Sequence, residues 1–152
     1  MRHIAIIGTG YVGLVSGSGI SDFGHKVICA DIAGEKIKML QAGKMPIYEP
    51  GLDELVDRNV KAERLSFSTD VGKTIRDSEV IFISVSTPQS ENGEADISAV
   101  KAVAKIIGKN LNERKVICTK STVPIGTGKI VSEIINENKS TETEFEYVSN
   151  PE

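Results

Sequence analysis

Short apolar runs alternate along this chain with longer stretches in which apolar residues recur every three or four positions. A short run bounded by turn residues is typical of a buried strand, and the longer spacing is typical of a helix with one apolar face. The pattern predicts strands at His3–Ile7, Lys26–Ala30, Leu65–Ser68, Val80–Ser84, Lys115–Thr119 and Phe145–Val148. It predicts helices at Tyr11–Phe23, Glu35–Gln41, Gly51–Asn59, Ile97–Lys109 and Gly128–Asn138.

The regular alternation of strands and helices predicts an α/β fold with a doubly wound parallel sheet of the Rossmann type. We expect about six strands with helices on both faces, forming one domain over residues 1–152. In such sheets the ligand lies in a crevice beyond the carboxyl ends of the strands. The polar stretch Gln89–Glu94 is short enough to form a loop over that crevice, and Asp96 is placed to cap the helix that follows.

A glycine-rich turn joins the first predicted strand directly to the first helix. It consists of Gly8, Thr9, Gly10, Tyr11, Val12 and Gly13. In dinucleotide-binding folds the first glycine makes the tight turn, the second lets the backbone approach a diphosphate, and the third lets the helix pack closely on the strand. The diphosphate then lies at a helix N-terminus, where free N–H groups favour an anion. The turn therefore predicts a dinucleotide site.

An acidic residue at the end of the second predicted strand supports this interpretation. Asp31 lies 21 residues after Gly10, close to the spacing of about 20 that such sites show. A carboxylate there accepts hydrogen bonds from the adenosine ribose and repels a 2′-phosphate, which predicts NAD rather than NADP. The alternative is that Asp31 only caps the following helix. We expect Lys36 to line the adenosine side of the site.

The composition excludes several other classes of protein. Of the 152 residues, 39% are hydrophobic and 26% are charged, which is typical of a folded domain without a membrane span. The formal net charge is -3 and no Lys/Arg run occurs, so neither nucleic acid nor a membrane surface is expected as a partner. The first apolar run is too short for a secretory signal, which favours the cytoplasm. Cys29 and Cys118 are expected to be buried free thiols, and no Cys/His spacing predicts a metal site.

Three further segments narrow the choice of family. They are Pro46–Leu52, Val85–Pro88 and Lys120–Thr127, and the last two follow predicted strands at the crevice. Together with the closing Ser149–Glu152, they resemble the N-terminal NAD-binding domain of the UDP-glucose 6-dehydrogenases, in the UDP-glucose/GDP-mannose dehydrogenase family. The resemblance covers essentially the whole chain in the order of that family's motifs.

The resemblance implies an enzyme that oxidises the C6 hydroxyl of UDP-glucose to a carboxylate, with two hydride transfers to two NAD molecules and a thioester on a cysteine. The residues that it implies as NAD contacts are Gly8, Thr9, Gly10, Tyr11, Val12, Gly13, Asp31, Lys36, Val85, Ser86, Thr87, Pro88, Ser121 and Thr122. It implies that Thr122 also holds the water near the reacting carbon, and that Glu152 assists proton transfer.

The resemblance also implies that the nucleophilic cysteine and most of the sugar-binding domain lie beyond residue 152, so that this chain alone is inactive and its full-length enzyme is a homo-oligomer. Two other functions remain open. One is a dehydrogenase for another nucleotide sugar, GDP-mannose or UDP-N-acetylmannosamine; the other is a free-standing NAD-sensing regulatory module. Ser121 and Thr122 also have a plainer interpretation, as a polar turn that caps the next helix.

Overall fold

Six parallel strands form a single sheet in the residues that the structure describes, 1–91 and 93–151 of the chain. In this computed structural model the strand order is β3-β2-β1-β4-β5-β6. The strands are β1 (His3–Ile7), β2 (Lys26–Ala30), β3 (Leu65–Ser68), β4 (Val80–Ile83), β5 (Lys115–Thr119) and β6 (Phe145–Ser149). The order reverses between β1 and β4, and this is the switch point at which doubly wound folds bind ligands. The predicted fold is confirmed.

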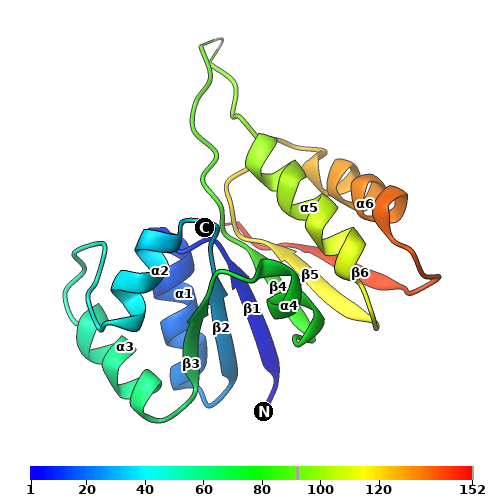
Figure 1. Cartoon of the computed structure of the whole chain (residues 1–152). Coiled ribbons are helices and arrows are strands. Elements are labelled where there is room, and N and C mark those ends of the chain that lie inside the picture. Colours follow the sequence, from blue (N-terminus) through cyan, green and yellow to red (C-terminus); the bar gives the residue numbers. More distant parts are fainter. Residues whose placement is uncertain (92, 152) are drawn as a thin grey trace.

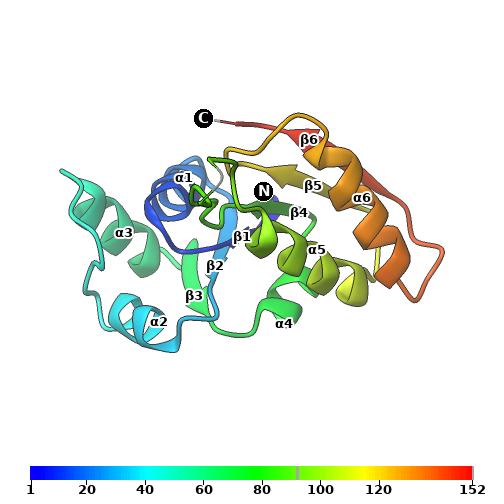
Figure 2. The ribbon, with the colours of Figure 1, turned by 90° about the horizontal axis from the view of Figure 1, so that it is seen from above.

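Helices cover both faces of the sheet, as Figure 1 and Figure 2 show. They are α1 (Tyr11–Asp22), α2 (Gly34–Gln41), α3 (Leu52–Lys61), α4 (Val71–Arg76), α5 (Ser98–Asn110) and α6 (Thr127–Asn138). The first three pack in one apolar cluster with β1, β2 and β3, and the last three pack in a second cluster on the other face. The N-terminal ends of α1 and α5 both point toward the carboxyl edge of the sheet (Figure 1).

Helix α4 was not predicted from the sequence. It has six residues, which is too short for an apolar period to show, although Val71 and Ile75 are buried one turn apart. Its start does carry a local signal, because the Asp70 carboxylate accepts a hydrogen bond from the Lys73 N–H at 2.8 Å. Tertiary packing of two apolar side chains therefore completes a helix that the pattern alone does not reveal.

Several element ends differ by one or two residues from the prediction. Gly51 precedes α3 instead of starting it, because its positive φ of 79° is incompatible with a helical residue. Strand β4 ends at Ile83 rather than Ser84, although the Ser84 N–H still donates to the Ile7 carbonyl at 2.8 Å. Strand β6 continues to Ser149 because its pairing with β5 continues that far.

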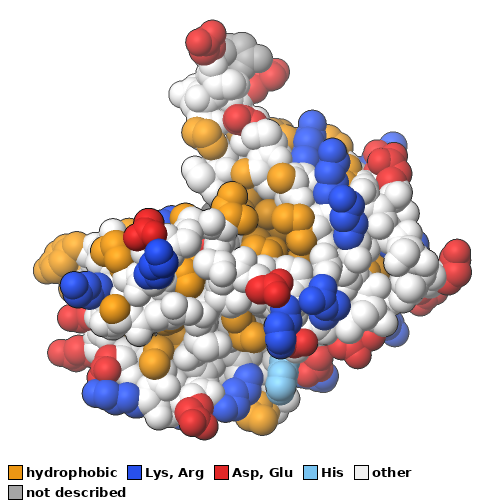
Figure 3. All heavy atoms as spheres, viewed as in Figure 1, with side chains coloured by type: hydrophobic (Ala, Val, Ile, Leu, Met, Phe, Trp, Pro, Cys, Tyr) orange, Lys and Arg blue, Asp and Glu red, His pale blue; other side chains and the backbone are white. Residues whose placement is uncertain are grey.

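The polar loop after β4 extends outward from the carboxyl edge of the sheet instead of folding down over the crevice (Figure 1). Apart from residue 92, which lies outside the described residues, its two sides meet at an antiparallel bridge between Gln89 and Ala95, and the Ser90 N–H donates to the Glu94 carbonyl at 2.8 Å. At its base the Asp96 carboxylate accepts the Ser98 N–H at 2.8 Å, so this residue caps the entry to α5 as predicted. The loop therefore leaves the hollow below it uncovered on the face shown in Figure 3.

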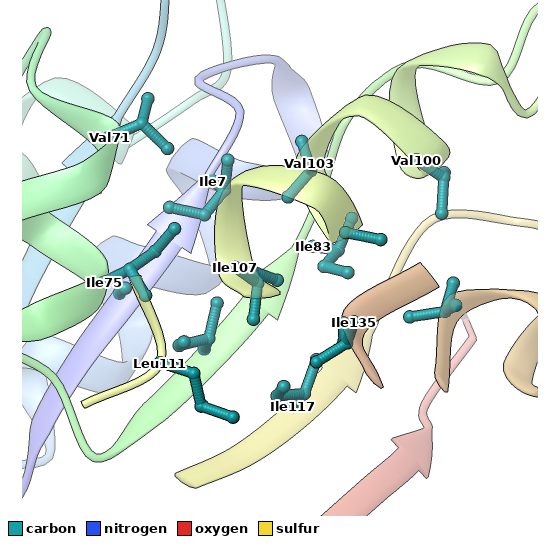
Figure 4. Close-up of a cluster of buried hydrophobic side chains, with 14 of the residues drawn as sticks. Ile7, Val71, Ile75, Ile83, Val100, Val103, Ile107, Leu111, Ile117 and Ile135 are labelled. Atoms are coloured by element: carbon teal, nitrogen blue, oxygen red, sulfur yellow. The ribbon is translucent and has the colours of Figure 1, made fainter. Parts of the chain in front are cut away.

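Branched aliphatic side chains fill the space between the sheet and α4, α5 and α6 (Figure 4). Ile83, Ile107, Ile117 and Ile135 are fully buried there. Burying a side chain of this size stabilises the folded state by about 1.5–3 kcal/mol, so each of these residues contributes strongly to the stability of the fold.

Both cysteines are buried and free, as predicted. Complete burial raises the pKa of the Cys29 thiol to about 12, so this group stays neutral at physiological pH. No helix within residues 1–91 and 93–151 combines the length and the apolar character needed to cross a membrane.

The two glycines in the middle of α1 give a matched pair for testing helix packing. A Cβ atom at Gly17 would lie 2.5 Å from the Cys29 sulfur, whereas one at Gly19 would meet nothing within 4 Å. We expect Gly17→Ala to lower the free energy of unfolding by about 1–3 kcal/mol through overpacking. Gly19→Ala is expected to raise it by up to about 1 kcal/mol through helix propensity. Urea denaturation checks both values, and equal effects would contradict this packing.

Candidate functional site

The glycine-rich turn has the shape that its sequence suggests. Gly8 has a φ of 107°, and a Cβ atom there would lie 2.5 Å from the Ser84 carbonyl oxygen. A Cβ atom at Gly13 would lie 2.0 Å from the Gly8 carbonyl oxygen, so α1 approaches the turn too closely for any side chain. A Cβ atom at Gly10 would meet nothing within 4 Å, so this glycine faces open space at the N-terminus of α1.

The Asp31 carboxylate ties this turn to the end of β2. One of its oxygens, Oδ2, accepts hydrogen bonds from the Thr9 N–H and the Thr9 hydroxyl, both at 2.8 Å. Its other oxygen, Oδ1, accepts the Ala33 N–H at 2.9 Å, and Ala33 is the residue before α2. Asp31 is therefore not the N-cap residue of α2, a position that Ala33 occupies; its carboxylate holds both the glycine turn and the residue that precedes the helix. The Lys36 ammonium lies 3.7 Å from Oδ2.

The environment of Asp31 favours its charged form. Partial burial by itself raises the pKa of the carboxyl. The hydrogen bonds from the Ala33 and Thr9 N–H groups and from the Thr9 hydroxyl, with the nearby Lys36 charge, outweigh that effect and lower the pKa below its ordinary value. An ionised carboxylate is thus fixed at the edge of the crevice, where it can also accept hydrogen bonds from ribose hydroxyls.

A hollow of about 310 Å³, lined mostly by apolar groups, opens beside the glycine turn. Figure 3 shows apolar side chains gathered in this hollow below the projecting loop. Its lining residues are Ile7, Gly8, Gly10, Ala30, Asp31, Ile32, Lys36, Val71, Ser84, Val85, Ser86, Ala99, Ala102, Val103 and Ile106. The unpredicted helix α4 and the first turns of α5 supply one wall, which offers an apolar surface for a purine base next to the Asp31 carboxylate.

A second hollow of about 300 Å³ adjoins the first and is more polar. Its lining residues are Gly10, Tyr11, Val12, Ser84, Val85, Ser86, Thr87, Lys120, Ser121 and Thr122. The two hollows share Gly10, Ser84, Val85 and Ser86, so they form one continuous crevice across the ends of β1, β4 and β5. Two adjoining hollows of this kind match the two halves of a dinucleotide.

Two hydroxyl groups in the second hollow join the loops that follow β4 and β5. The Ser121 hydroxyl donates to the Val85 carbonyl at 2.7 Å, and the Thr87 hydroxyl donates to the Thr122 carbonyl at 2.7 Å. The idea that Ser121 caps the next helix is therefore wrong, because its hydroxyl reaches β4 and Gly126 precedes α6. Thr122 is exposed and lines the hollow.

Not every residue predicted for the site reaches the crevice. Thr9 is fully buried and acts through Asp31, and Gly13 lies against the turn. The Pro88 carbonyl accepts the Asp96 N–H at 2.8 Å at the base of the projecting loop. Glu152 lies outside the described residues. The described part of the chain contains no group of three or more His, Cys, Asp or Glu side chains placed to hold a metal ion.

The Pro46–Leu52 motif lies away from the crevice, at the start of α3. Glu49, Pro50, Gly51 and Leu52 line a separate hollow of about 290 Å³ against α1 and α3. Within this chain the motif therefore shapes the packing of α3 and contributes nothing to the two hollows described above.

Sequence reasoning missed two parts of the site. One is the apolar wall of the first hollow: its α5 part resembles an ordinary buried helix face in the sequence, and its α4 part shows no helical period at all. Ser84 was assigned to the end of a strand, yet it is 93% buried (7% exposed) and its hydroxyl has no hydrogen-bond partner among the described residues. A serine directly after the apolar residues of β4 is the one available signal in the sequence.

The residues of the crevice fit a dinucleotide. Gly10 leaves open space at a helix N-terminus, Asp31 presents an ionised acceptor at one end, and Ser84 presents an unpaired buried hydroxyl between the two hollows. A turn of this kind followed by a helix suits a diphosphate, and the apolar wall suits a base. Fold and site together define a dinucleotide-binding domain of the Rossmann type.

Comparison with known proteins identifies the family. Residues 2–152 match the NAD binding domain of the UDP-glucose/GDP-mannose dehydrogenase family, and the chain belongs to that family. NAD is therefore the cofactor of this domain.

Relatives in several organisms agree with this assignment. The chain is 53% identical to UDP-glucose 6-dehydrogenase TuaD of Bacillus subtilis, over 100% of this chain and 33% of that protein. It is 49% identical to UDP-glucose 6-dehydrogenase of Rhizobium meliloti, over 98% of this chain and 34% of that protein. The chain thus spans about a third of each of these two relatives.

Solved structures show the same architecture. A UDP-glucose dehydrogenase from Pyrobaculum islandicum superimposes with a TM-score of 0.96 at 34% identity, over 100% of this chain and 36% of that one. A ternary complex of GDP-mannose dehydrogenase from Pseudomonas aeruginosa superimposes with a TM-score of 0.94 at 37% identity, over 99% of this chain and 36% of that one.

Asp31 provides a test of cofactor choice. We expect Asp31→Asn to weaken NAD binding about tenfold and to leave NADP binding equal or stronger, because the substitution removes an ionic acceptor and its repulsion of a 2′-phosphate. Calorimetric titration of both cofactors measures the change. Asp22→Asn, at the exposed end of α1, is the control and should leave both affinities unchanged. Equal affinity of the unmodified chain for NAD and NADP would refute the assignment.

Asp31 also predicts an acid-dependent loss of stability. Its pKa is lowered in the folded state, so its contribution is complete above the ordinary Asp value of about 4 and disappears as the pH falls through the lowered value. Urea unfolding at pH 7 and pH 3 should show a larger stability difference between wild type and Asp31→Asn at pH 7. Asp22 and Glu79, which also have lowered pKa values, titrate in both proteins and cancel. A difference that stays constant with pH would contradict the prediction.

Proposed function

We propose that the whole protein is an NAD-dependent UDP-glucose 6-dehydrogenase that oxidises the C6 hydroxyl of UDP-glucose to a carboxylate. The observation that carries this proposal is the 53% identity to a UDP-glucose 6-dehydrogenase over all 152 residues. The identity to GDP-mannose 6-dehydrogenase of Pseudomonas aeruginosa is lower, at 38% over 156 aligned residues. The order and spacing of the Val85–Pro88 and Lys120–Thr127 motifs support the same family reaction rather than a sensor module, which needs no reacting group beside the cofactor.

In this proposal the chain holds NAD along the crevice. The backbone N–H groups at Gly10, Tyr11 and Val12 bind the diphosphate at the N-terminus of α1. Asp31 accepts the ribose hydroxyls with Lys36 beside it, and the adenine packs against the wall from α4 and α5. When bound, the cofactor accepts the hydride removed from the sugar.

The nicotinamide end lies in the second hollow. Val85, Ser86 and Thr87 form one side of it, and Ser121 and Thr122 form the other. Because the hydroxyls of Ser121 and Thr87 donate to main-chain carbonyls, they position the two loops and leave backbone groups to orient the ring. Thr122, which is exposed to the hollow, holds a water near the reacting carbon, and Glu152 assists proton transfer to or from it.

The remaining two thirds of the protein are proposed to supply the nucleophilic cysteine and most of the sugar-binding site. Cys29 and Cys118 are unsuited to that role, because both are buried and burial raises the pKa of each thiol. We further propose a cytoplasmic homo-oligomer for the whole protein.

Turnover and binding can be separated by experiment. The 152-residue chain is expected to bind NAD but to form no NADH from UDP-glucose, since the nucleophile is missing. The full-length protein should form two NADH per UDP-glucose and should prefer UDP-glucose to GDP-mannose and UDP-N-acetylmannosamine, as followed by absorbance at 340 nm. Steady turnover by the 152-residue chain, or a preference for another sugar nucleotide, would overturn the proposal.

A further inference from the structure

Ser84 carries a buried hydroxyl that the folded chain does not use. The residue directly follows β4 and is 7% exposed. Its Oγ atom has no hydrogen-bond partner among the described residues. Most buried polar side chains in proteins are hydrogen-bonded, because an unpaired hydroxyl loses its contacts with water without replacement.

The backbone around Ser84 is held firmly in place. Its N–H donates to the Ile7 carbonyl at 2.8 Å, which extends the pairing of β4 with β1 by one residue. On the other side its carbonyl lies so close to Gly8 that a Cβ atom there would approach within 2.5 Å. The Ser84 N–H thus continues the sheet and its carbonyl lies against the glycine turn, whereas its hydroxyl has no hydrogen-bond partner among the described residues.

The position of Ser84 indicates which part of a dinucleotide this hydroxyl meets. Ser84 lines both hollows of the crevice, together with Gly10 at the N-terminus of α1. A dinucleotide with its adenosine in the first hollow and its nicotinamide in the second passes this point with its diphosphate and its second ribose. Those parts present oxygen atoms, which suit a neutral hydroxyl that can donate and accept.

We propose that Ser84 is a further NAD-binding residue, whose hydroxyl donates a hydrogen bond to an oxygen of the diphosphate or nicotinamide ribose. This inference rests on the proposed placement of NAD along the crevice. In this proposal the hydroxyl contributes to the affinity for the cofactor. It contributes nothing to the stability of the chain without ligand.

Ser78 provides a matched control. It is also a buried serine with an unpaired hydroxyl, at 1% exposure, but it precedes β4 at the opposite edge of the sheet from the crevice. Alanine at either position removes the same atom from a similar environment. Only the change at Ser84 should therefore affect a ligand in the crevice.

The test measures binding by calorimetry and stability by thermal unfolding for wild type, Ser84→Ala and Ser78→Ala. We expect Ser84→Ala to weaken NAD and ADP-ribose about tenfold and to leave AMP unchanged, because AMP lacks the diphosphate and the second ribose. The melting temperature without ligand should stay equal or rise. Ser78→Ala should leave all three affinities unchanged.

The outcomes separate this inference from the placement of the cofactor. If wild type binds NAD and Ser84→Ala binds it within twofold of wild type, the inference alone is overturned. An equal loss of AMP binding, or a fall in melting temperature that accompanies the weaker binding, would likewise overturn it. Failure of wild type to bind NAD would overturn both the inference and the proposed cofactor site.

Discussion

The crevice depends on one carboxylate. Asp31 ends β2, receives both the N–H and the hydroxyl of Thr9, and accepts the Ala33 N–H before α2. These three bonds fix the glycine turn relative to the second strand, and so they fix the direction in which the N-terminus of α1 points. The carboxylate is also the acceptor proposed for the adenosine ribose. In that proposal the same group shapes the turn and contacts the cofactor.

Close backbone approach explains the other half of this arrangement. Gly8 lies against the main chain of Ser84, Gly13 lies against Gly8, and Gly17 lies against the Cys29 sulfur. At each of these glycines a neighbouring group occupies the space that a side chain would fill, so α1 packs closely on β1 and β2. The cost in helix propensity is therefore balanced by packing at Gly17, whereas Gly19 in the same helix has no such contact.

In the second hollow, hydroxyl groups hold the loops. Ser121 and Thr87 each donate across the gap between the loops after β4 and β5. Preorganised loops lower the cost of ordering a bound ligand, which suits a site that must align two reacting groups. Solved structures of a UDP-glucose dehydrogenase and of a GDP-mannose dehydrogenase share the architecture of this chain.

Local pattern was enough to predict all six strands, five of the six helices, the glycine turn and Asp31, since each depends on residues that are close in sequence or on a regular spacing. Helix α4 was missed because six residues show no period. The hydrogen bond of Ser121 and the unpaired hydroxyl of Ser84 are visible only in the tertiary structure. The Ser121 hydroxyl donates to a carbonyl 36 residues away in the sequence, and the Ser84 hydroxyl has no hydrogen-bond partner among the described residues. Contacts between distant residues leave no periodic trace in a sequence, because folding alone brings those residues together.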